Sequence, residues 1–238
     1  MRDNNVPTIF LDLDNVLFDA DGFKKDLGGS VEEILGGSDK FWRVYEETRE
    51  AKGVVDFKNI WSVAERFWGE SKTEKVKTWF KEVDLSEYLM EGVEELLNFL
   101  KTKYELKILT EGSYDWQLEK LRRTGLLDHF TKDGCLNVAN SSILACEDKF
   151  RFIPQLMDSE KCSRSPVVVE DKLEILREVK RVNPEAVCIL MNHGVYAERS
   201  KGEDLGDIIK VESLTEVMEK VKQCSKEGDR GVGKEFYR

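Results

Sequence analysis

The chain has 238 residues and a formal net charge of −10; 40% of its residues are hydrophobic and 35% are charged. This length and apolar content permit a sizeable core, in one large domain or two small ones, and they exclude a disordered chain. The acidic balance argues against nucleic acid or an anionic membrane as the main partner.

The cysteines and the apolar runs indicate a protein of a reducing compartment. Five cysteines, an odd number without a Cys-x-x-Cys pair, predict neither a disulfide framework nor a zinc site. The segment from Met1 to Asn5 contains no apolar signal region. The longest apolar run, Ala186 to Met191, is far too short to span a bilayer. We therefore expect a cytoplasmic protein that is not inserted in a membrane.

The first predicted element is a strand that runs into two carboxylates. Pro7 to Leu11 is apolar and β-prone, which predicts a strand buried on both faces in the middle of a parallel sheet. Asp12 and Asp14 follow it directly. Two like charges this close resist ionisation, and a divalent cation would remove that cost. For this motif alone, an acidic turn without a function remains the alternative.

The segment from Phe18 to about Leu89 changes character, because every strong pattern in it predicts a helix. Ser38, Asp56 and Thr73 can each cap one helix. The expected buried faces are Phe41, Val44, Tyr45 and Thr48; Ile60, Val63, Ala64 and Phe67; and Val76, Trp79 and Phe80. No strand is indicated, so we expect a separate helical insert.

Most of the large aromatic residues fall in this insert. They could form a stacking platform for a ring, but their recurrence at helical spacing favours the core of a small helical subdomain. Trp42 and Trp68 lie off the predicted buried faces. We expect these two aromatics to be the most available for another contact.

From Glu91 onward, predicted strands alternate with predicted helices. The helices are Glu91–Lys103, Asp115–Arg123, Lys149–Met157, Lys172–Val182 and Ser213–Cys224; the strands are Leu106–Leu109, Val167–Val169, Ala186–Met191 and Ile208–Val211, with a weak strand signal near Phe130. This alternation is typical of βαβ units, a mostly parallel sheet and helices on both faces. We predict an α/β fold: a Rossmann-like core of residues 1–17 and 90–238, with residues 18–89 as the inserted helical part.

Reactive side chains follow three of the predicted strands. Asp12 and Asp14 follow the first, Thr110 follows the second, and Glu170 and Asp171 follow the third. In open α/β sheets, ligands bind at the carboxyl ends of the strands. We therefore expect the fold to gather these groups at one edge of the sheet.

Two assignments at this edge have alternatives. Lys149 begins the helix that leads toward the third strand, and it is the basic residue best placed to join the site; Lys132 and Lys172 remain alternatives. Thr110 could simply cap the helix that follows it.

The chemistry that fits this set is phosphoryl transfer with magnesium. A hard cation would take Asp12, Asp171, a backbone carbonyl and waters as ligands. Asp12 would be the nucleophile that forms an aspartyl phosphate, with Thr110 and Lys149 holding the phosphoryl oxygens. Asp14 would protonate the leaving oxygen and later accept a proton from water.

Four motifs in register make the chain resemble the haloacid dehalogenase superfamily, in its magnesium-dependent phosphatase branch. They are Asp12-Leu13-Asp14-Asn15-Val16, which matches D-x-D-x-[TV], then Leu109-Thr110, Lys149 and Glu170-Asp171. Each motif alone is weak, but their order and spacing agree and they span the whole predicted core.

The resemblance implies roles for these residues and for the insert. It places Asp12 and Asp14 in catalysis, Thr110, Glu111 and Lys149 at the phosphate, and Asp12, Asp14, Glu170 and Asp171 at the Mg²⁺ ion. It makes the insert an α-helical cap that sets the substrate, a small phosphorylated metabolite. It also implies that Asp19–Gly22 lies in a mobile turn that lets the cap open.

The sequence departs from the family pattern at three positions. Asn15 replaces the commoner Gly, and Asn tolerates the left-handed conformation nearly as well. Glu111 replaces an Asn, and we expect its carboxylate to repel a second anionic group on a substrate. After Asp171 the next acid is Glu174, which we expect to be a solvated helix residue. The metal shell is therefore expected to rest on Glu170, directly or through water.

Hydrolysis of a phosphate monoester is the expected reaction. The nearest alternative is a phosphomutase or another phosphotransferase on the same core, and the other is a non-catalytic binding protein of the same fold. A dehalogenase is disfavoured because its chemistry has no leaving oxygen for Asp14 to protonate. His193 and Tyr196, which follow the last core strand, are expected to be loop residues.

Overall fold

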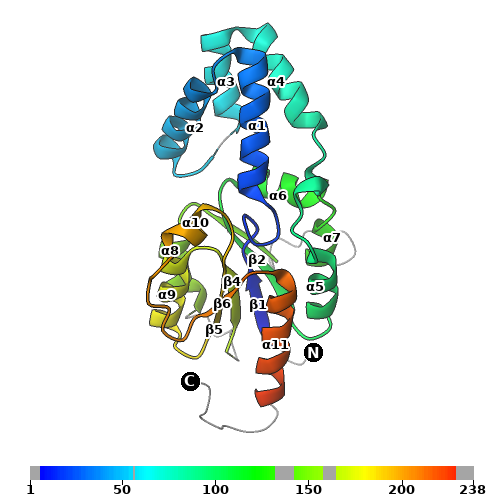
Figure 1. The fold of residues 1–238 in the computed structure, drawn as a ribbon, viewed down its shortest axis with the longest axis vertical. Coiled ribbons are helices and arrows are strands. Elements are labelled where there is room, and N and C mark those ends of the chain that lie inside the picture. The colour runs from blue at the N-terminus through cyan, green and yellow to red at the C-terminus, as the bar shows by residue number, and fades with distance from the viewer. Residues whose placement is uncertain (1–5, 56, 132–141, 158–164, 229–238) are drawn as a thin grey trace.

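The computed structural model describes residues 6–55, 57–131, 142–157 and 165–228. These residues form a six-stranded parallel sheet with helices on both faces and a helical insert above one end of the sheet (Figure 1). The strands are β1 (Thr8–Leu11), β2 (Glu105–Glu111), β3 (Ile143–Cys146), β4 (Val167–Glu170), β5 (Val187–Met191) and β6 (Ile209–Val211). The helices are α1 (Ala20–Leu35), α2 (Ser38–Lys52), α3 (Phe57–Trp68), α4 (Glu70–Glu82), the 3₁₀ helix η1 (Leu85–Tyr88), α5 (Val93–Leu100), α6 (Tyr114–Arg123), α7 (Leu127–Phe130), α8 (Lys149–Met157), α9 (Leu173–Val182), α10 (Gly194–Arg199) and α11 (Leu214–Gly228).

The strand order β3-β2-β1-β4-β5-β6 places β1 at the centre of the sheet. Leu11 lies opposite Ile108 of β2 on one side and Val169 of β4 on the other. The chain leaves β1 toward β2 and later returns to β4 on the opposite side. The carboxyl ends of β1 and β4 therefore form the switch point of the sheet, where open α/β folds bind their ligands.

The side chains of β1 alternate between two apolar layers. Ile9 and Leu11 belong to one buried cluster with residues of α5 and α11, whereas Phe10 belongs to a second cluster with residues of α8 and α9. The strand is thus buried on both faces, as its continuous apolar run predicts. This burial confirms the predicted α/β class and fixes the direction in which β1 delivers Asp12.

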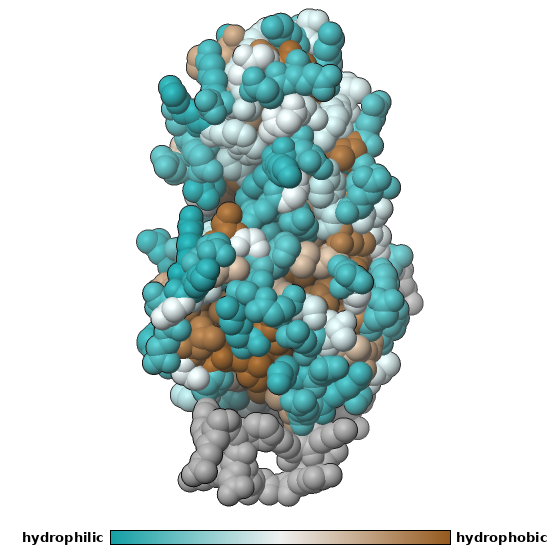
Figure 2. All heavy atoms as spheres, viewed as in Figure 1, coloured by the Kyte–Doolittle hydropathy of each residue, from teal (hydrophilic) through white to brown (hydrophobic). Residues whose placement is uncertain are grey.

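Helices α1 to α4 lie between β1 and β2 in the chain and form the insert, with α1 rising from the edge of the sheet into it (Figure 1). The core of the insert is aromatic: Phe41 is fully buried, and the ring of Phe80 lies 4.4 Å from that of Phe57 and 5.5 Å from that of Trp61, centroid to centroid. The visible face of the insert is largely hydrophilic (Figure 2). The structure therefore favours the core interpretation of these aromatics over a stacking platform.

Three details of the insert differ from the sequence expectations. Thr73 lies inside α4, where its hydroxyl donates to the Gly69 carbonyl (3.0 Å), so it does not cap the helix. Phe67 is 52% exposed, whereas Trp42 and Trp68 pack against the core. A one-residue error in assigning the buried face of a helix exchanges such neighbours. The predicted cap Asp56 lies outside the described residues.

Two other segments adopt a structure that the sequence pattern did not indicate. The stretch Asp19–Gly22, expected as a mobile turn, is the start of α1, and the Asp19 carboxylate caps that helix by accepting from the Gly22 N–H (2.9 Å). The segment near Phe130 is helix α7, and the outer strand on that side is β3. Of the β3 residues only Ile143 is buried, so this edge strand has a weak hydrophobic pattern.

Of the described cysteines, Cys146 and Cys188 are free thiols; Cys135 and Cys162 lie outside the described residues. Within the described ranges, no helix has both the length and the apolar character needed to cross a membrane.

The turn that follows β1 is fixed by two residues with left-handed backbones. Asn15 has a φ of 58°, which confirms that Asn serves in place of Gly at this position. Gly194, with a φ of 67°, approaches this turn so closely that a Cβ atom would lie 2.5 Å from Asp21 Oδ2 and 2.9 Å from Asn15 Nδ2. The start of α10 is thus packed against the connection between β1 and α1.

We predict that Gly194→Ala destabilises the protein by about 1–3 kcal/mol, because alanine strains the left-handed backbone and displaces Asp21 and Asn15. Gly29→Ala is the matched control: Gly29 is exposed in α1, and a Cβ there meets no atom within 4 Å. Alanine there should be neutral or add up to about 1 kcal/mol through helix propensity. Urea unfolding measures both, and equal stabilities for the two variants would contradict the packing described here.

Candidate active site

Asp12 stands directly after β1, at the centre of the carboxyl edge of the sheet. Its backbone N–H donates to the Val169 carbonyl (2.9 Å), which extends the pairing of β1 with β4 by one residue. The side chain is 4% exposed; Oδ1 accepts from the Leu13 N–H (2.7 Å) and Oδ2 lies 2.8 Å from the Lys149 ammonium. Both oxygens of this carboxylate are therefore oriented by fixed donors.

Lys149 is a buried ammonium that joins two strands. It is 1% exposed at the start of α8, and its Nζ also lies 2.7 Å from Glu170 Oε2. Burial alone would lower the pKa of Lys149, but the adjacent carboxylates of Asp12 and Glu170 outweigh burial and raise it. Lys149 is therefore charged. Of the alternatives, Lys172 is paired elsewhere and Lys132 lies outside the described residues.

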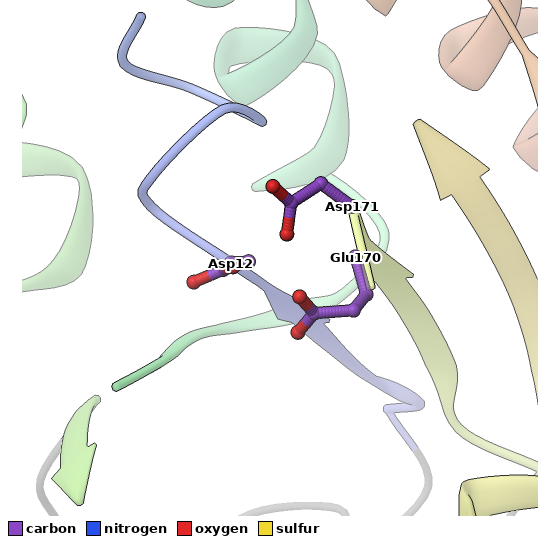
Figure 3. Close-up of side chains that lie close together, drawn as sticks. All are labelled: Asp12, Glu170 and Asp171. Atoms are coloured by element: carbon purple, nitrogen blue, oxygen red, sulfur yellow. The ribbon is translucent and has the colours of Figure 1, made fainter. Parts of the chain in front are cut away.

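Asp171 completes a group of buried carboxylates with Asp12 and Glu170 (Figure 3). One oxygen of each lies within 4.8 Å of the others. Asp171 Oδ2 accepts from the Asn15 side-chain amide (3.1 Å), while the buried Oδ1 has no hydrogen-bond partner among the described residues. Glu170 differs, because its oxygens accept from Lys149 and from the Lys172 N–H (3.3 Å).

The electrostatics of this group fit a divalent cation. Burial, then the charge of Glu170, raises the pKa of Asp12 to about 8, although Lys149 opposes the rise. Burial and the charge of Asp12 raise the pKa of Asp171 to about 6. Lys149 supplies one positive charge against three carboxylates. Because hard divalent cations prefer carboxylate oxygens, the unpartnered oxygen of Asp171 beside Asp12 suits such an ion.

The Asp14 carboxylate contacts residues outside this cluster. Its Oδ1 is paired with the Lys120 ammonium, and Gln117 Nε2 lies 3.4 Å from Oδ2. Burial raises the pKa of Asp14, but the charge of Lys120 more than offsets it, so the pKa lies below its ordinary value. Asp14 was expected at the metal, yet its carboxylate is not one of the three clustered groups.

Thr110 lies near the end of β2, fully buried, and its hydroxyl has no hydrogen-bond partner among the described residues. It belongs to the strand and is separated from α6 by Ser113, which precedes that helix, so the helix-cap alternative is wrong. A buried hydroxyl without a partner is costly unless a ligand uses it. Thr110 lines the same cavity as Asp12 and Lys149.

Glu111 is neutralised by a neighbour. Its carboxylate is paired with the Lys172 ammonium, and its backbone carbonyl accepts from Gln117 Nε2 (2.8 Å). The ion pair offsets the negative charge of Glu111, and the expected repulsion of a second anionic group of a substrate stays a prediction. The expected contact between Glu111 and phosphate remains a prediction.

The site opens into a cavity of about 420 Å³ that lies between the sheet edge and the helical insert. This volume lies in the range of small-molecule sites. The core contributes Asp12, Asp14, Thr110, Lys149 and Asp171 to its lining, and α1, α2 and the segment after α2 close it from the other side.

Sequence reasoning missed several groups at this site. Lys120 and Gln117 lie one turn apart on α6, on the same buried face as Leu121. The only sequence signal for them is that a charged and a polar residue occupy a helix face that is otherwise apolar. Tyr196, expected in a loop, lies in α10 and lines the cavity, and His193 Nε2 lies 3.3 Å from Asp19 Oδ1. Glu174 is exposed on α9, as expected.

No protein-family model and no curated protein sequence matches this chain. Solved structures do match it. A haloacid dehalogenase-like hydrolase from Burkholderia xenovorans LB400 is 21% identical with a TM-score of 0.73, and the match covers 90% of this chain and 98% of that one. A haloacid dehalogenase-like family hydrolase from Xanthomonas campestris is 13% identical with a TM-score of 0.64 and 98% coverage of both chains.

Two further matches differ in what their descriptions say. The HAD-hydrolase YfnB from Bacillus subtilis, described as bound to magnesium, is 16% identical with a TM-score of 0.53, covering 91% of this chain and 99% of that one. A structure described as a dehalogenase is 15% identical with a TM-score of 0.52, covering 91% and 97%. At these identities the similarity shows the fold: the chain has the haloacid dehalogenase-like fold with a buried acidic cluster.

We predict that Mg²⁺ raises the thermal unfolding midpoint, and does so more at pH 8 than at pH 6. Between the ordinary pKa of an aspartate and about 8, folded Asp12 binds a proton more tightly than the unfolded chain does, so rising pH destabilises the metal-free fold. Magnesium replaces that proton and restores stability. Differential scanning fluorimetry with and without Mg²⁺ measures the shift.

Asp171→Asn should shrink this Mg²⁺-dependent shift, and because it removes a buried charge it should also stabilise the metal-free protein. Glu174→Gln, an exposed change three residues away, is the control and should behave as wild type. A shift of equal size in Asp171→Asn and wild type would place the cation elsewhere.

Proposed function

We propose that this chain, which has the haloacid dehalogenase-like fold, is a magnesium-dependent phosphatase that hydrolyses a small phosphate monoester through an aspartyl phosphate on Asp12. The observation that carries the proposal is the meeting of Asp12, charged Lys149 and the unpartnered Thr110 hydroxyl on one cavity wall, beside Asp171. A nucleophile, two groups that bind phosphoryl oxygens and a cation ligand are the parts that phosphoryl transfer requires.

In the first step, a carboxylate oxygen of Asp12 attacks phosphorus, the bond from phosphorus to the leaving oxygen breaks, and protonated Asp14 gives its proton to that oxygen. Lys149 lies 2.8 Å from Asp12 Oδ2 and is placed to bind a phosphoryl oxygen as the new bond forms. The Thr110 hydroxyl has no competing acceptor among the described residues, so it is free to donate to another phosphoryl oxygen. Glu170 holds the Lys149 ammonium in position.

In the second step, water attacks phosphorus, Asp14 takes its proton, and Asp12 and inorganic phosphate are released. The ion pair with Lys120 favours ionised Asp14, which is the form that accepts a proton. The same pair opposes the protonated form that the leaving oxygen requires. Substrates with good leaving groups therefore depend least on this residue.

The metal would be held by Asp12 and Asp171, with Glu170 engaged mainly by Lys149. When bound, Mg²⁺ would supply positive charge that keeps Asp12 ionised and offsets the charge of the phosphoryl oxygens. YfnB, which shares the fold, is described as bound to magnesium, which supports the choice of ion.

Other reactions on this fold make different demands. Dehalogenation releases a halide and needs no proton at the leaving atom, so it would leave Asp14 with its partners Lys120 and Gln117 unused. A phosphotransferase would use the same first step but hand the phosphoryl group to a second substrate instead of water. In a non-catalytic protein, the unpartnered Thr110 hydroxyl and the carboxylate cluster short of positive charge would destabilise the fold without a compensating function.

We predict that the purified protein hydrolyses 4-nitrophenyl phosphate with Mg²⁺, and that thorough chelation abolishes the reaction. Asp12→Asn removes the nucleophile and should reduce turnover to the uncatalysed background, while Glu174→Gln retains it. Release of halide from 2-haloacids, measured in parallel, should not occur. Full activity after chelation, or wild-type turnover by Asp12→Asn, would refute the proposed reaction.

Asp14→Ala should discriminate between leaving groups. Loss of acid help should lower kcat/KM roughly 10²–10⁴-fold for an alkyl phosphate, and far less for an aryl phosphate whose oxygen leaves unaided. Asp128→Ala, an exposed change on α7, is the control. Stopped-time assays of inorganic phosphate with both substrates measure the effect. Equal losses for the two substrates would remove Asp14 from the protonation of the leaving group.

A further inference from the structure

The insert presents hydrogen-bond donors to the catalytic residues across the cavity. Tyr45 and Arg49 lie one turn apart on α2, and Lys24 lies in the second turn of α1; all three line the cavity that contains Asp12 and Thr110. None of these donors has a part in the two chemical steps. They face the space that remains once a phosphoryl group occupies the core end.

Tyr45 is the most informative of the three. Its side chain is largely buried, at 7% exposed, and it lines the cavity; its hydroxyl makes no hydrogen bond to a described residue. The hydroxyl is not one of the buried polar atoms that lack a partner, so it is accessible from the cavity that Tyr45 lines, where a ligand can accept its hydrogen bond. Because the ring of Tyr45 is fixed against Trp42 (5.3 Å) and Phe57 (6.2 Å, centroid to centroid), its hydroxyl cannot easily turn to another acceptor.

Arg49 and Lys24 supply positive charge beside this hydroxyl. The Arg49 guanidinium lies 2.7 Å from Glu46, and both side chains are about half exposed, so several of its five donors remain for a ligand. Lys24 is exposed, and no ion pair joins it to the described residues; its charge acts on Asp14 and Lys120 across the cavity.

Outside the cluster of Asp12, Glu170 and Asp171, the acids of the core end are balanced by internal pairs. Asp14 is paired with Lys120 and Glu111 with Lys172. At the insert end, the acid that lines the cavity is Glu50, which opposes two cations. The lining of that end therefore contains two cations and one acid, and Glu46 outside the lining also pairs with Arg49.

Apolar side chains connect the two ends. The rings of Phe57 and Trp116 meet edge to face, 5.0 Å apart, and both line the cavity together with Val54 and Val55. Trp116 belongs to α6 of the core and Phe57 begins α3 of the insert, so the wall is complete only when the insert lies over the sheet.

From these observations we infer that the insert end of the cavity is a specificity subsite. Arg49, Tyr45 and Lys24 bind a second anionic group on the leaving part of the substrate. Phe57 and Trp116 flank the apolar portion that links this anionic group to the phosphate. The inference rests on the proposed function and names its substrate class, a phosphate monoester with an apolar ring or chain and a carboxylate or second phosphoryl group. The shared chemistry of those two anions is what Arg49 would recognise.

The test compares 4-carboxyphenyl phosphate with its neutral amide, 4-carbamoylphenyl phosphate. The two have nearly the same shape, and the amide is the better leaving group, so intrinsic reactivity favours the amide. Wild-type protein should prefer the carboxylate by about tenfold or more in kcat/KM, as expected for a charge-assisted bond. A wild-type preference for the amide would overturn the inference.

Variants assign that preference to residues. Arg49→Gln should lower the carboxylate-to-amide ratio about tenfold, Arg49→Lys should restore part of it, and Tyr45→Phe should lower it by a smaller factor. Arg43→Gln, an exposed change on the same helix outside the cavity, is the control and should keep the wild-type ratio. An unchanged ratio in Arg49→Gln would overturn the role of Arg49. A 1,4-phenylene bisphosphate run in parallel separates carboxylate from phosphate recognition.

A binding measurement separates this inference from the proposed function. Calorimetric titration of 4-carboxybenzylphosphonate and its amide requires no turnover. If the protein hydrolyses neither phosphate but binds the carboxylate phosphonate about tenfold more tightly, through Arg49, the proposed reaction fails and the subsite stands. If it hydrolyses both phosphates without preference and binds both phosphonates equally, the reaction stands and the subsite fails.

Discussion

The burial of Lys149 between Asp12 and Glu170 is the interaction on which the rest of the site depends. Taking these charges out of water at the ends of β1 and β4 is unfavourable unless they pair closely, and both contacts are shorter than 3 Å. The pairing links the central strand to its neighbour, but it leaves the cluster short of positive charge because Asp171 lies beside it. The fold thus carries a local instability that a cation would relieve, as functional sites often do.

The same edge of the sheet controls the position of the helical insert. Asn15 donates to Asp171 and accepts from the Asp21 N–H, while Asp21 accepts from the Val195 N–H (2.8 Å). The turn after β1 therefore joins a carboxylate of the site, the first turn of α1 and the start of α10. A movement of the insert about this turn would shift Asn15 and, through its hydrogen bond, the carboxylate of Asp171. The position of the insert and the geometry of the metal-binding carboxylates are therefore linked.

The elements that could be predicted from the sequence are those defined by patterns among neighbouring residues. A continuous apolar run identified β1, and the D-x-D motif after it located Asp12; the helix that begins at Lys149 has the predicted bounds. The pattern failed at β3, whose edge position leaves it half-buried, and at Asp19–Gly22, where a cap was mistaken for a turn. The pairings of Lys120 with Asp14 and of Lys172 with Glu111 could not be predicted, because each joins residues more than 60 positions apart in the chain. The pairing of Glu111 in particular offsets a charge that the sequence shows as unpaired.

The most direct test of this account asks whether phosphate becomes attached to Asp12. Protein mixed with a reactive aryl phosphate and Mg²⁺ is quenched in acid within milliseconds, and intact mass followed by peptide mapping locates any phosphoryl group. The account predicts one phosphoryl group on the peptide that contains Asp12, formed faster than steady-state turnover and absent from Asp12→Asn. Turnover of the substrate without any phosphorylated protein, or a phosphoryl group on another residue, would contradict it.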